Sequence, residues 1–272
     1  MRLFEYYERD TFLHRLNPMA KLVAIAVLIG ALTPAFDPLT PVIFLLLIVA
    51  VMWTLGRIPI LYILRALLPF WAVALSFIVF NAFLYNVGRV EHPTVLFTWG
   101  SLMVTREGLE AGFSLGMRAV CIVCTSMLFI MTTDPTEFAL SLIHQARIPY
   151  RFGYAILVSY RFMPMLQTEY DIIRAAHRVR GVGGRAGLKE RYYELKRYAI
   201  PLLASAIRKS ERVAIAMDSK AFGALPQRTY YRTVRLRATD WLFLVAVILC
   251  TVAILLILWR LGSLRGYGFV PE

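Results

Sequence analysis

The sequence has few of the residues from which catalytic and metal sites are built. Its 272 residues include only 17 Asp and Glu, and its four histidines are scattered along the chain. The long apolar runs contain no paired acidic residues, and no stretch resembles a glycine-rich phosphate-binding loop. These shortages argue against a membrane-embedded enzyme and against a chain that binds and hydrolyses ATP itself.

Cysteine is also scarce, and its placement excludes two further possibilities. The three cysteines, Cys121, Cys124 and Cys250, all lie inside apolar runs, and an odd number there argues against a disulfide framework. Cys121 and Cys124 share one helix face, but no third and fourth ligand lies near them in the sequence. We therefore predict no metal site.

Apolar and basic residues are abundant. Hydrophobic residues make up 59% of the chain, and 30 Lys and Arg give a net charge of +13. Soluble domains are about 45–50% apolar. This combination favours an integral membrane protein with a basic face over a soluble nucleic-acid-binding protein. No secretory signal is expected, because the first apolar run begins only after about 20 residues.

Five apolar runs predict an all-α membrane protein with about five transmembrane helices. The first two are shorter than the roughly 20 residues that cross a bilayer, so we expect them to form a hairpin lengthened by its flanks. We divide the chain into residues 1–133 with helices one to four, a coupling domain of long amphipathic helices at 134–238, and a last transmembrane helix within 239–272. The five runs are residues 22–36, 39–55, 66–85, 109–133 and 241–259.

Basic residues predict the orientation in the membrane. Residues 134–238 hold 19 Lys and Arg against 8 Asp and Glu, and four more basic residues precede or begin the first run. The positive-inside rule then places the N-terminus and the coupling domain in the cytoplasm and the C-terminus outside. Arg89 and Arg106 lie on the outer side in this arrangement and count against it.

The fourth apolar run carries two notable features. Gly108, Gly112 and Gly116 are spaced by four residues, so one helix face allows the close approach of another helix, either internal or from a partner. Arg118 lies about two turns inside the run. We expect its side chain to reach the membrane interface, with a functional role as the alternative.

Helix starts can be predicted at two places. Asn17 before Pro18, and Asp134 before Pro135, combine an N-cap residue with proline at the first helical position. The helix after Asp134 should be short and should end near residue 147.

Two longer amphipathic helices should follow. The first runs from about residue 152 to Gly181, with Pro164 inside it as a bend or hinge. A basic, tyrosine-rich connector extends to residue 199, and the second helix begins near Pro201 and ends by Gly223. Each has an apolar stripe at helical period, which predicts helices that pack on each other or lie along the membrane surface.

The two helices end alike. Val179-Arg180-Gly181 closes the first, and Ser219-Lys220-Ala221 closes the second, with Gly223 just beyond. One explanation is structural, because a cation near a helix C-terminus offsets its dipole and glycine is the usual stop. The repetition favours a second explanation, in which each cation enters a groove of a partner and meets carboxylates there.

Several motifs resemble a known family. They are L-N-P-x-x-K at 16–21, T-T-D-P at 132–135, Y-R-F-M-P at 160–164, A-A-H-R-V-R-G at 175–181, and I-P-L-L followed by A-M-D-S-K-A-F-G within 200–223. In this order, over nearly the whole chain, they resemble the transmembrane T component of energy-coupling factor (ECF) transporters.

The resemblance implies partners and roles. A T component joins two cytoplasmic ABC ATPases, which hold the ATP and Mg, to a membrane S subunit that binds a vitamin or metal ion. It binds no cofactor itself, is not an enzyme, and lies in the cytoplasmic membrane of a bacterium or archaeon. Two Ala-Arg-Gly signatures contact the ATPases. Val179-Arg180-Gly181 keeps the Arg and Gly, whereas Ser219-Lys220-Ala221 differs at all three positions but retains a cation.

Two other functions stay open. A channel-forming permease of an ordinary ABC importer would also dock ATPases, but normally with one coupling helix per subunit and as a dimer. A lipid-binding scaffold would use the same basic surface. The sequence does not decide the transported substrate, whether the ATPases are identical, whether the S subunit is dedicated or shared, or what Lys220 in place of Arg changes.

Overall fold

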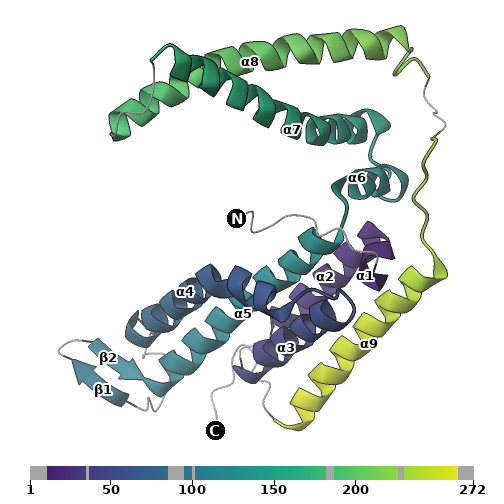
Figure 1. Ribbon diagram of the computed structural model, residues 1–272. Helices are drawn as coiled ribbons and strands as arrows, with labels where there is room; N and C mark the ends of the chain where they lie inside the picture. The colour runs from purple at the N-terminus through teal and green to yellow at the C-terminus, as the bar shows by residue number, and fades with distance from the viewer. Residues whose placement is uncertain are drawn as a thin grey trace. The chain divides into compact units, whose positions relative to one another are not determined.

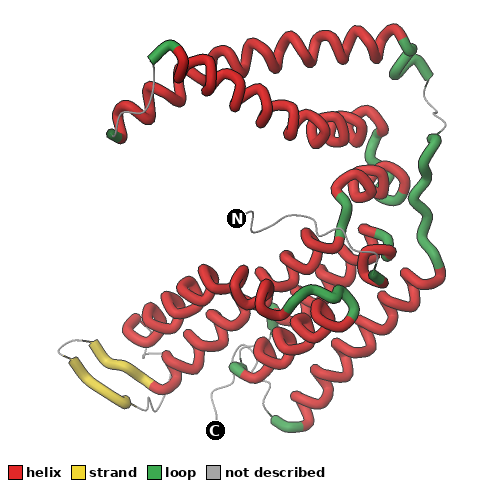
Figure 2. The backbone as a smooth tube through the Cα atoms, in the orientation of Figure 1, coloured by secondary structure: helices red, strands yellow, loops and turns green. Residues whose placement is uncertain are grey.

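The computed structural model describes residues 11–34, 37–84, 95–99, 102–181, 187–225 and 230–262. These residues are mostly helical, with one two-stranded antiparallel hairpin (Figures 1 and 2), so the predicted all-α membrane fold is confirmed. The elements are α1 (Phe12–Arg15), α2 (Pro18–Leu32), α3 (Leu39–Thr54), α4 (Ile60–Leu84), β1 (Val95–Trp99), β2 (Leu102–Thr105), α5 (Arg106–Thr132), α6 (Pro135–His144), α7 (Tyr150–Val179), α8 (Leu188–Ser219) and α9 (Ala238–Arg260).

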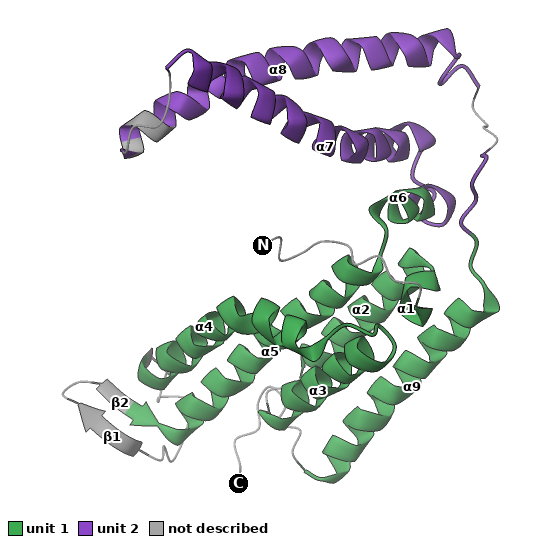
Figure 3. Cartoon of the chain, in the orientation of Figure 1, with its two compact units in different colours: residues 1–141, 235–272 green, residues 142–234 purple. Residues whose placement is uncertain are grey.

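The chain divides into two compact units (Figure 3). One comprises residues 1–141 with 235–272, and the other comprises residues 142–234. The second unit lies within the 134–238 range that the sequence assigned to a coupling domain. The first unit includes both the N-terminal apolar helices and α9, so helices from the two ends of the sequence pack together.

Three helices of the described residues are long and apolar enough to cross a membrane: α4, α5 and α9. The first two apolar runs form the shorter helices α2 and α3, of 15 and 16 residues. At 1.5 Å per residue these are about 22–24 Å long, less than the ~30 Å hydrocarbon core. Both helices pack within the first unit, but each is too short to cross the hydrocarbon core.

The core of the first unit forms around α5. This helix packs against α4, α3 and α2, and its cysteines are core residues: the sulfurs of Cys124 and Met52 lie 3.8 Å apart. The close packing of these side chains holds the helices of the first unit together. The apolar core residues of α5 are Met117, Val120, Cys121, Cys124, Met127 and Met131, and core residues of the other helices include Phe44, Ile48, Met52, Ile63 and Leu67.

Glycines bring α4 and α5 into close contact. A Cβ atom on Gly112 would lie 2.9 Å from the Cα of Ile78, and one on Gly116 would lie 2.8 Å from the carbonyl oxygen of Ala74. The helix that faces these glycines is therefore the internal helix α4. Gly108 has a different position, in the first turn of α5, where its N–H donates to the Thr105 side chain at 3.2 Å.

Polar side chains fasten the N-terminal ends of α2 and α9. The side chain of Asn17 accepts a hydrogen bond from the Met19 N–H, which confirms the predicted cap, and the Asn17 N–H donates to Asp240 at 2.9 Å. Asp240 is 1% exposed, and its other carboxylate oxygen accepts from the Arg237 N–H at 2.7 Å. One buried carboxylate therefore joins the beginnings of two helices that are more than 220 residues apart.

Lys21 ties α2 to the C-terminal end of α5. Its side chain is 2% exposed, and its Nζ donates to the Thr132 carbonyl oxygen at 2.6 Å and the Thr133 hydroxyl at 3.4 Å. A cation here meets the negative end of the helix dipole and satisfies a terminal carbonyl. The Lys of the L-N-P-x-x-K motif thus has a packing role.

The starts of α6 and α8 were also predicted from the sequence. Asp134 caps α6 through a 2.8 Å hydrogen bond from the Thr136 N–H, as predicted. The predicted start of the last amphipathic helix near Pro201 was wrong, because α8 begins at Leu188 and Pro201 lies inside it. The connecting residues are mostly Leu, Lys, Glu and Arg, good helix formers that extend the helix before the proline.

Candidate functional site

The second unit is built on an antiparallel pair of long helices, α7 and α8. They contain 30 and 32 residues, which corresponds to about 45–48 Å each. Near the C-terminal half of α7, Lys209 of α8 forms an ion pair with Glu169, and this hydrogen bond holds the pKa of Glu169 below its ordinary value. The ring of Tyr198 lies 5.9 Å from that of Tyr170 and 5.2 Å from that of His177.

The opposite end of the pair is closed by the segment that follows α8. The ring of Phe222 lies 5.0 Å from that of Tyr154 and 5.7 Å from that of Tyr150. Arg151 donates to the Gly223 carbonyl oxygen at 2.8 Å. Contacts at both ends therefore set the relative position of the two helices.

The C-terminal end of α8 has the hydrogen bonds of a Schellman motif. Lys220 is the C-cap, the Ala221 N–H donates to Asp218 at 2.9 Å, and the Phe222 N–H donates to Met217 at 3.0 Å. Ala221 has a φ of +54°, in the left-handed region that glycine normally occupies at this position. The backbone turns away sharply, and Lys220 stays at the tip of the helix.

The end of α7, as far as it is described, has matching geometry. Arg180 is the C-cap, Gly181 has a φ of +70°, and its N–H donates to the Arg178 carbonyl oxygen at 2.9 Å. Ala221 thus occupies the position in α8 that Gly181 occupies in α7. The two sequence signatures, although different in all but charge, fold into equivalent helix ends.

Both tips are exposed and lie at opposite ends of the helix pair. Val179, although apolar, is 89% exposed, and Arg180, Ser219 and Lys220 are exposed as well. Within the described residues neither cation forms an ion pair. Because Arg180 lies beyond the Tyr198 contacts and Lys220 lies near the Phe222 contacts, about 30 Å of helix separates them.

The apolar stripes of α7 and α8 are largely left uncovered by this chain. Gly153 is the buried residue of α7, and Tyr198 and Ser205 are the described buried residues of α8. The expected packing of the stripes on each other occurs only in part: Phe162 and Leu166 of α7 and Met217 of α8 are half-buried, whereas other members are exposed. The exposed apolar residues of the two helices include five stripe members, Phe152, Ile156, Met163, Leu203 and Ile207, and also Ile172 and Ile215; all are 48–68% exposed.

Pro164 lies within α7, which continues through it without a break. The Thr168 hydroxyl donates to the Pro164 carbonyl oxygen at 3.1 Å. Proline cannot donate to the carbonyl four residues earlier, so the helix lacks one backbone hydrogen bond here. The predicted hinge is at a locally weakened turn, and its movement stays a prediction.

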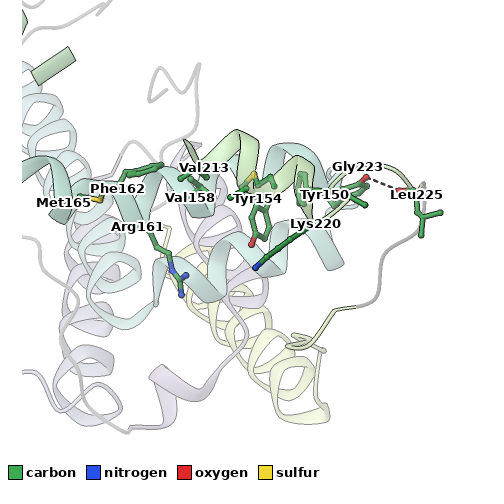
Figure 4. A pocket seen from close by; sticks show the side chains of 14 residues that line it. Tyr150, Tyr154, Val158, Arg161, Phe162, Met165, Val213, Lys220, Gly223 and Leu225 are labelled. Atoms are coloured by element: carbon green, nitrogen blue, oxygen red, sulfur yellow. Dashed lines mark hydrogen bonds between the residues drawn. The ribbon is translucent and has the colours of Figure 1, made fainter. Parts of the chain in front are cut away.

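A groove of about 610 Å³ lies beside Lys220, between the N-terminal half of α7 and the C-terminal end of α8 (Figure 4). Arg161 also lines it, a residue that the sequence analysis named only as part of the Y-R-F-M-P motif and to which it gave no role. No sequence signal links positions 161 and 220, because they meet only through the antiparallel pairing. Other lining residues are Tyr150, Tyr154, Val158, Phe162, Met165, Val213, Met217 and Leu225.

Metal-binding chemistry has no candidate in this region. Among the described residues, no group of three or more His, Cys, Asp or Glu side chains is arranged to hold a metal ion. The site therefore consists of two exposed cationic helix ends, apolar faces and one groove, an arrangement suited to protein contacts.

A family comparison identifies the chain. Residues 9–231 match the CbiQ family, described as cobalt transport protein. The chain belongs to this family. It is 28% identical over 267 residues to the energy-coupling factor transporter transmembrane protein EcfT of Lactococcus lactis subsp. cremoris, covering 95% of this chain and 97% of that protein.

Other relatives have the same description. EcfT of Heliobacterium modesticaldum is 30% identical over 95% of this chain and 97% of its own length, and EcfT of Bacillus subtilis is 27% identical over 91% and 94%. The predicted relationship to the T components of ECF transporters is confirmed. The chain is thus a membrane component of a transporter.

Proposed function

We propose that this chain couples ATP hydrolysis by two cytoplasmic ABC ATPase subunits to the reorientation of a membrane S subunit that carries a vitamin or metal ion. The observation that carries the proposal is the pair of equivalent helix ends. Arg180 and Lys220 cap two long helices with the same turn, stand exposed, and lie at opposite ends of one helix pair. One such chain can contact two ATPases at once.

The geometry of α7 and α8 supports a role in transmitting movement from the ATPases. Each ATPase would receive one cationic tip by apolar packing and an ion pair, and the movement of the ATPases on closure would shift the two tips relative to each other. Helices of 30 and 32 residues, joined by the Lys209–Glu169 ion pair and aromatic contacts, would carry that shift as a unit. The exposed apolar faces of α7 and α8 would then be covered by partner subunits or by the membrane surface.

The chain itself would supply no nucleotide chemistry. ATP and Mg would be bound by the ATPases, and the transported solute by the S subunit, so this chain would act without a cofactor of its own. The excess of basic residues supports a cytoplasmic position for the helix pair. Lys220 offers a single point charge where Arg offers a bidentate fork, so the two ATPase contacts would differ in geometry.

Charge reversal at one tip tests the proposal. We expect Arg180→Glu to release the ATPases from the detergent-solubilised complex and to abolish uptake, because the substituted carboxylate repels the acidic groove it should enter. Arg174→Glu is the matched control, since Arg174 is an exposed arginine on the same helix away from the tip. If the ATPases co-purify with the Arg180→Glu chain as with wild type, the assignment of this tip is wrong.

Stoichiometry separates the main alternative. A bridging subunit predicts one copy of this chain per ATPase pair, whereas a channel-forming permease of an ordinary ABC importer predicts two. Native mass spectrometry of the purified complex distinguishes these ratios directly.

A further inference from the structure

We infer that Arg161 and Lys220 form one composite site for an acidic segment of an ATPase subunit, in which Arg161 supplies the guanidinium fork that Lys220 lacks. This inference rests on the proposed function and assigns a further residue to its second contact. It begins from the groove between α7 and α8, which both cations line.

Helical spacing explains why both cations face the groove. Tyr154, Val158, Arg161 and Met165 of α7 are separated by three or four residues, so they share one face of that helix. Val213, Met217 and Lys220 do the same on α8. The antiparallel pairing sets the two faces opposite each other, and Figure 4 shows the charged ends of Arg161 and Lys220 extending to the same side of the groove.

Arg161 and Lys220 have no acidic partner among the described residues. Both side chains are exposed, neither forms an ion pair with another described residue, and none of the residues lining the groove is acidic. A carboxylate bound in this groove would therefore meet two cations and no competing acidic side chain. An Arg can bind both carboxylate oxygens, while Lys adds a point charge beside it.

The walls of the groove favour a peptide segment as its occupant. Between the positions of Tyr154 and Met165, α7 advances about 16 Å, the length of three helical turns. Along this length the walls are formed by apolar and aromatic side chains of both helices. A short segment with apolar residues and one carboxylate satisfies both the walls and the charges, as in helix-in-groove recognition.

The composite site also accounts for the altered second signature. At the α7 tip, Arg180 carries its own fork, and Gly181 provides the turn. At the α8 tip, the cation is a Lys, and the nearest guanidinium lining the groove belongs to the other helix. We therefore expect Arg161 to matter for the second ATPase contact and not for the first.

The test measures the affinity of the purified ATPase pair, identified by mass spectrometry in the native complex, for this chain in nanodiscs. We expect Arg161→Ala and Lys220→Ala each to weaken binding by about tenfold, because each removes half of a charge-assisted contact. The double variant should lose less affinity than the product of the two single losses, since both cations bind the same carboxylate. Arg174→Ala should bind within about twofold of wild type.

The decisive variant restores the fork at the helix tip. In a Lys220→Arg chain, Arg161→Ala should lose much less affinity than in wild type. If Arg161→Ala binds the ATPases as tightly as wild type while Lys220→Ala binds them more weakly, the composite site is wrong. The proposed coupling function would still stand. If Arg180→Glu also binds normally, the coupling function itself fails.

Lipid is the remaining occupant that the experiment separates. Measurements are made in nanodiscs of phosphatidylcholine alone and of phosphatidylcholine with phosphatidylglycerol. An Arg161→Ala effect that occurs only with the anionic lipid would overturn the proposal and assign the groove to a headgroup. The same loss of affinity in both lipids supports the peptide site.

Discussion

At the scale of single residues, the two helix ends differ most at the turn position. Gly181 and Ala221 both have positive φ, but only glycine adopts this conformation without a steric penalty. In sequence, the two signatures differ in Arg180 against Lys220. The backbone shows a second difference: the turn after α8 places Ala221 in the left-handed region, where its Cβ is sterically unfavourable.

The first prediction concerns this strained alanine. We expect Ala221→Gly to stabilise the turn after α8 by about 1 kcal/mol, because it removes the clash of Cβ in the left-handed region. Hydrogen exchange of the Ala221 and Phe222 amides, which bond to Asp218 and Met217, should slow by about fivefold. Ala214→Gly, in the exposed helical interior, should speed local exchange instead; slowing by both would refute the explanation.

At the scale of helices, glycines bring the backbones of α4 and α5 close together. Gly112 and Gly116 approach backbone atoms of α4 at distances that no Cβ can occupy without movement. The spacing of the glycines predicted such a face, and the structure supplied the partner helix. Gly108, the third glycine of the series, is explained by the Thr105 cap at the helix start.

The second prediction tests this contact. We expect Gly116→Ala to lower the thermal stability of the detergent-solubilised chain by an amount equivalent to about 1–3 kcal/mol, because the helices must separate. Gly30→Ala is the matched control in α2, where an added Cβ meets no atom within 4 Å. It should leave stability unchanged or raise it by up to about 1 kcal/mol. Equal effects of the two substitutions would show that helix propensity, not packing, decides.

The third prediction concerns the ion pair between α7 and α8. The pKa of Glu169 is lowered, chiefly by the Lys209 hydrogen bond, so the folded state binds its proton less readily than the unfolded state. The pair's stabilisation is therefore complete above the ordinary glutamate pKa, near 4.3, and is lost as pH falls through the lower folded value.

We expect Glu169→Gln to flatten the acid limb of the thermal unfolding midpoint measured between pH 3 and 7. Glu211→Gln, at an exposed position of α8, is the control and should leave that limb as in wild type. High salt should reduce the wild-type slope, because the pair is partly exposed and is screened. An unchanged acid limb in Glu169→Gln would contradict this role for the ion pair.

At the scale of the whole molecule, the chain combines a bundle of apolar helices with a helix pair, α7 and α8, whose apolar side chains are largely exposed. Three helices of spanning length and two shorter ones make the bundle, and the second unit exposes large apolar residues along α7 and α8. A surface of this kind in a membrane transporter component is expected to meet other subunits.

The fourth prediction tests orientation. In a background lacking the three native cysteines, Val179→Cys and Ser219→Cys should react with a membrane-impermeant maleimide in inside-out vesicles and not in right-side-out vesicles. The reason is that both residues flank exposed tips in the strongly basic part of the chain. Labelling of either position from the outside would reverse the predicted topology.

The sequence by itself determined the membrane class, the apolar runs, the caps at Asn17 and Asp134, and the two cationic tips. These follow from local composition and spacing, which a short stretch of chain expresses without its neighbours. It failed at the start of α8, where helix propensity before Pro201 outweighed the proline signal.

The tertiary structure alone decided which helix faces Gly112 and Gly116, that Lys21 binds the end of α5, and that Arg161 joins Lys220 at one groove. Each of these pairs residues that are 34 or more positions apart. Their meeting depends on how helices pack, a property of three-dimensional complementarity that no local pattern encodes.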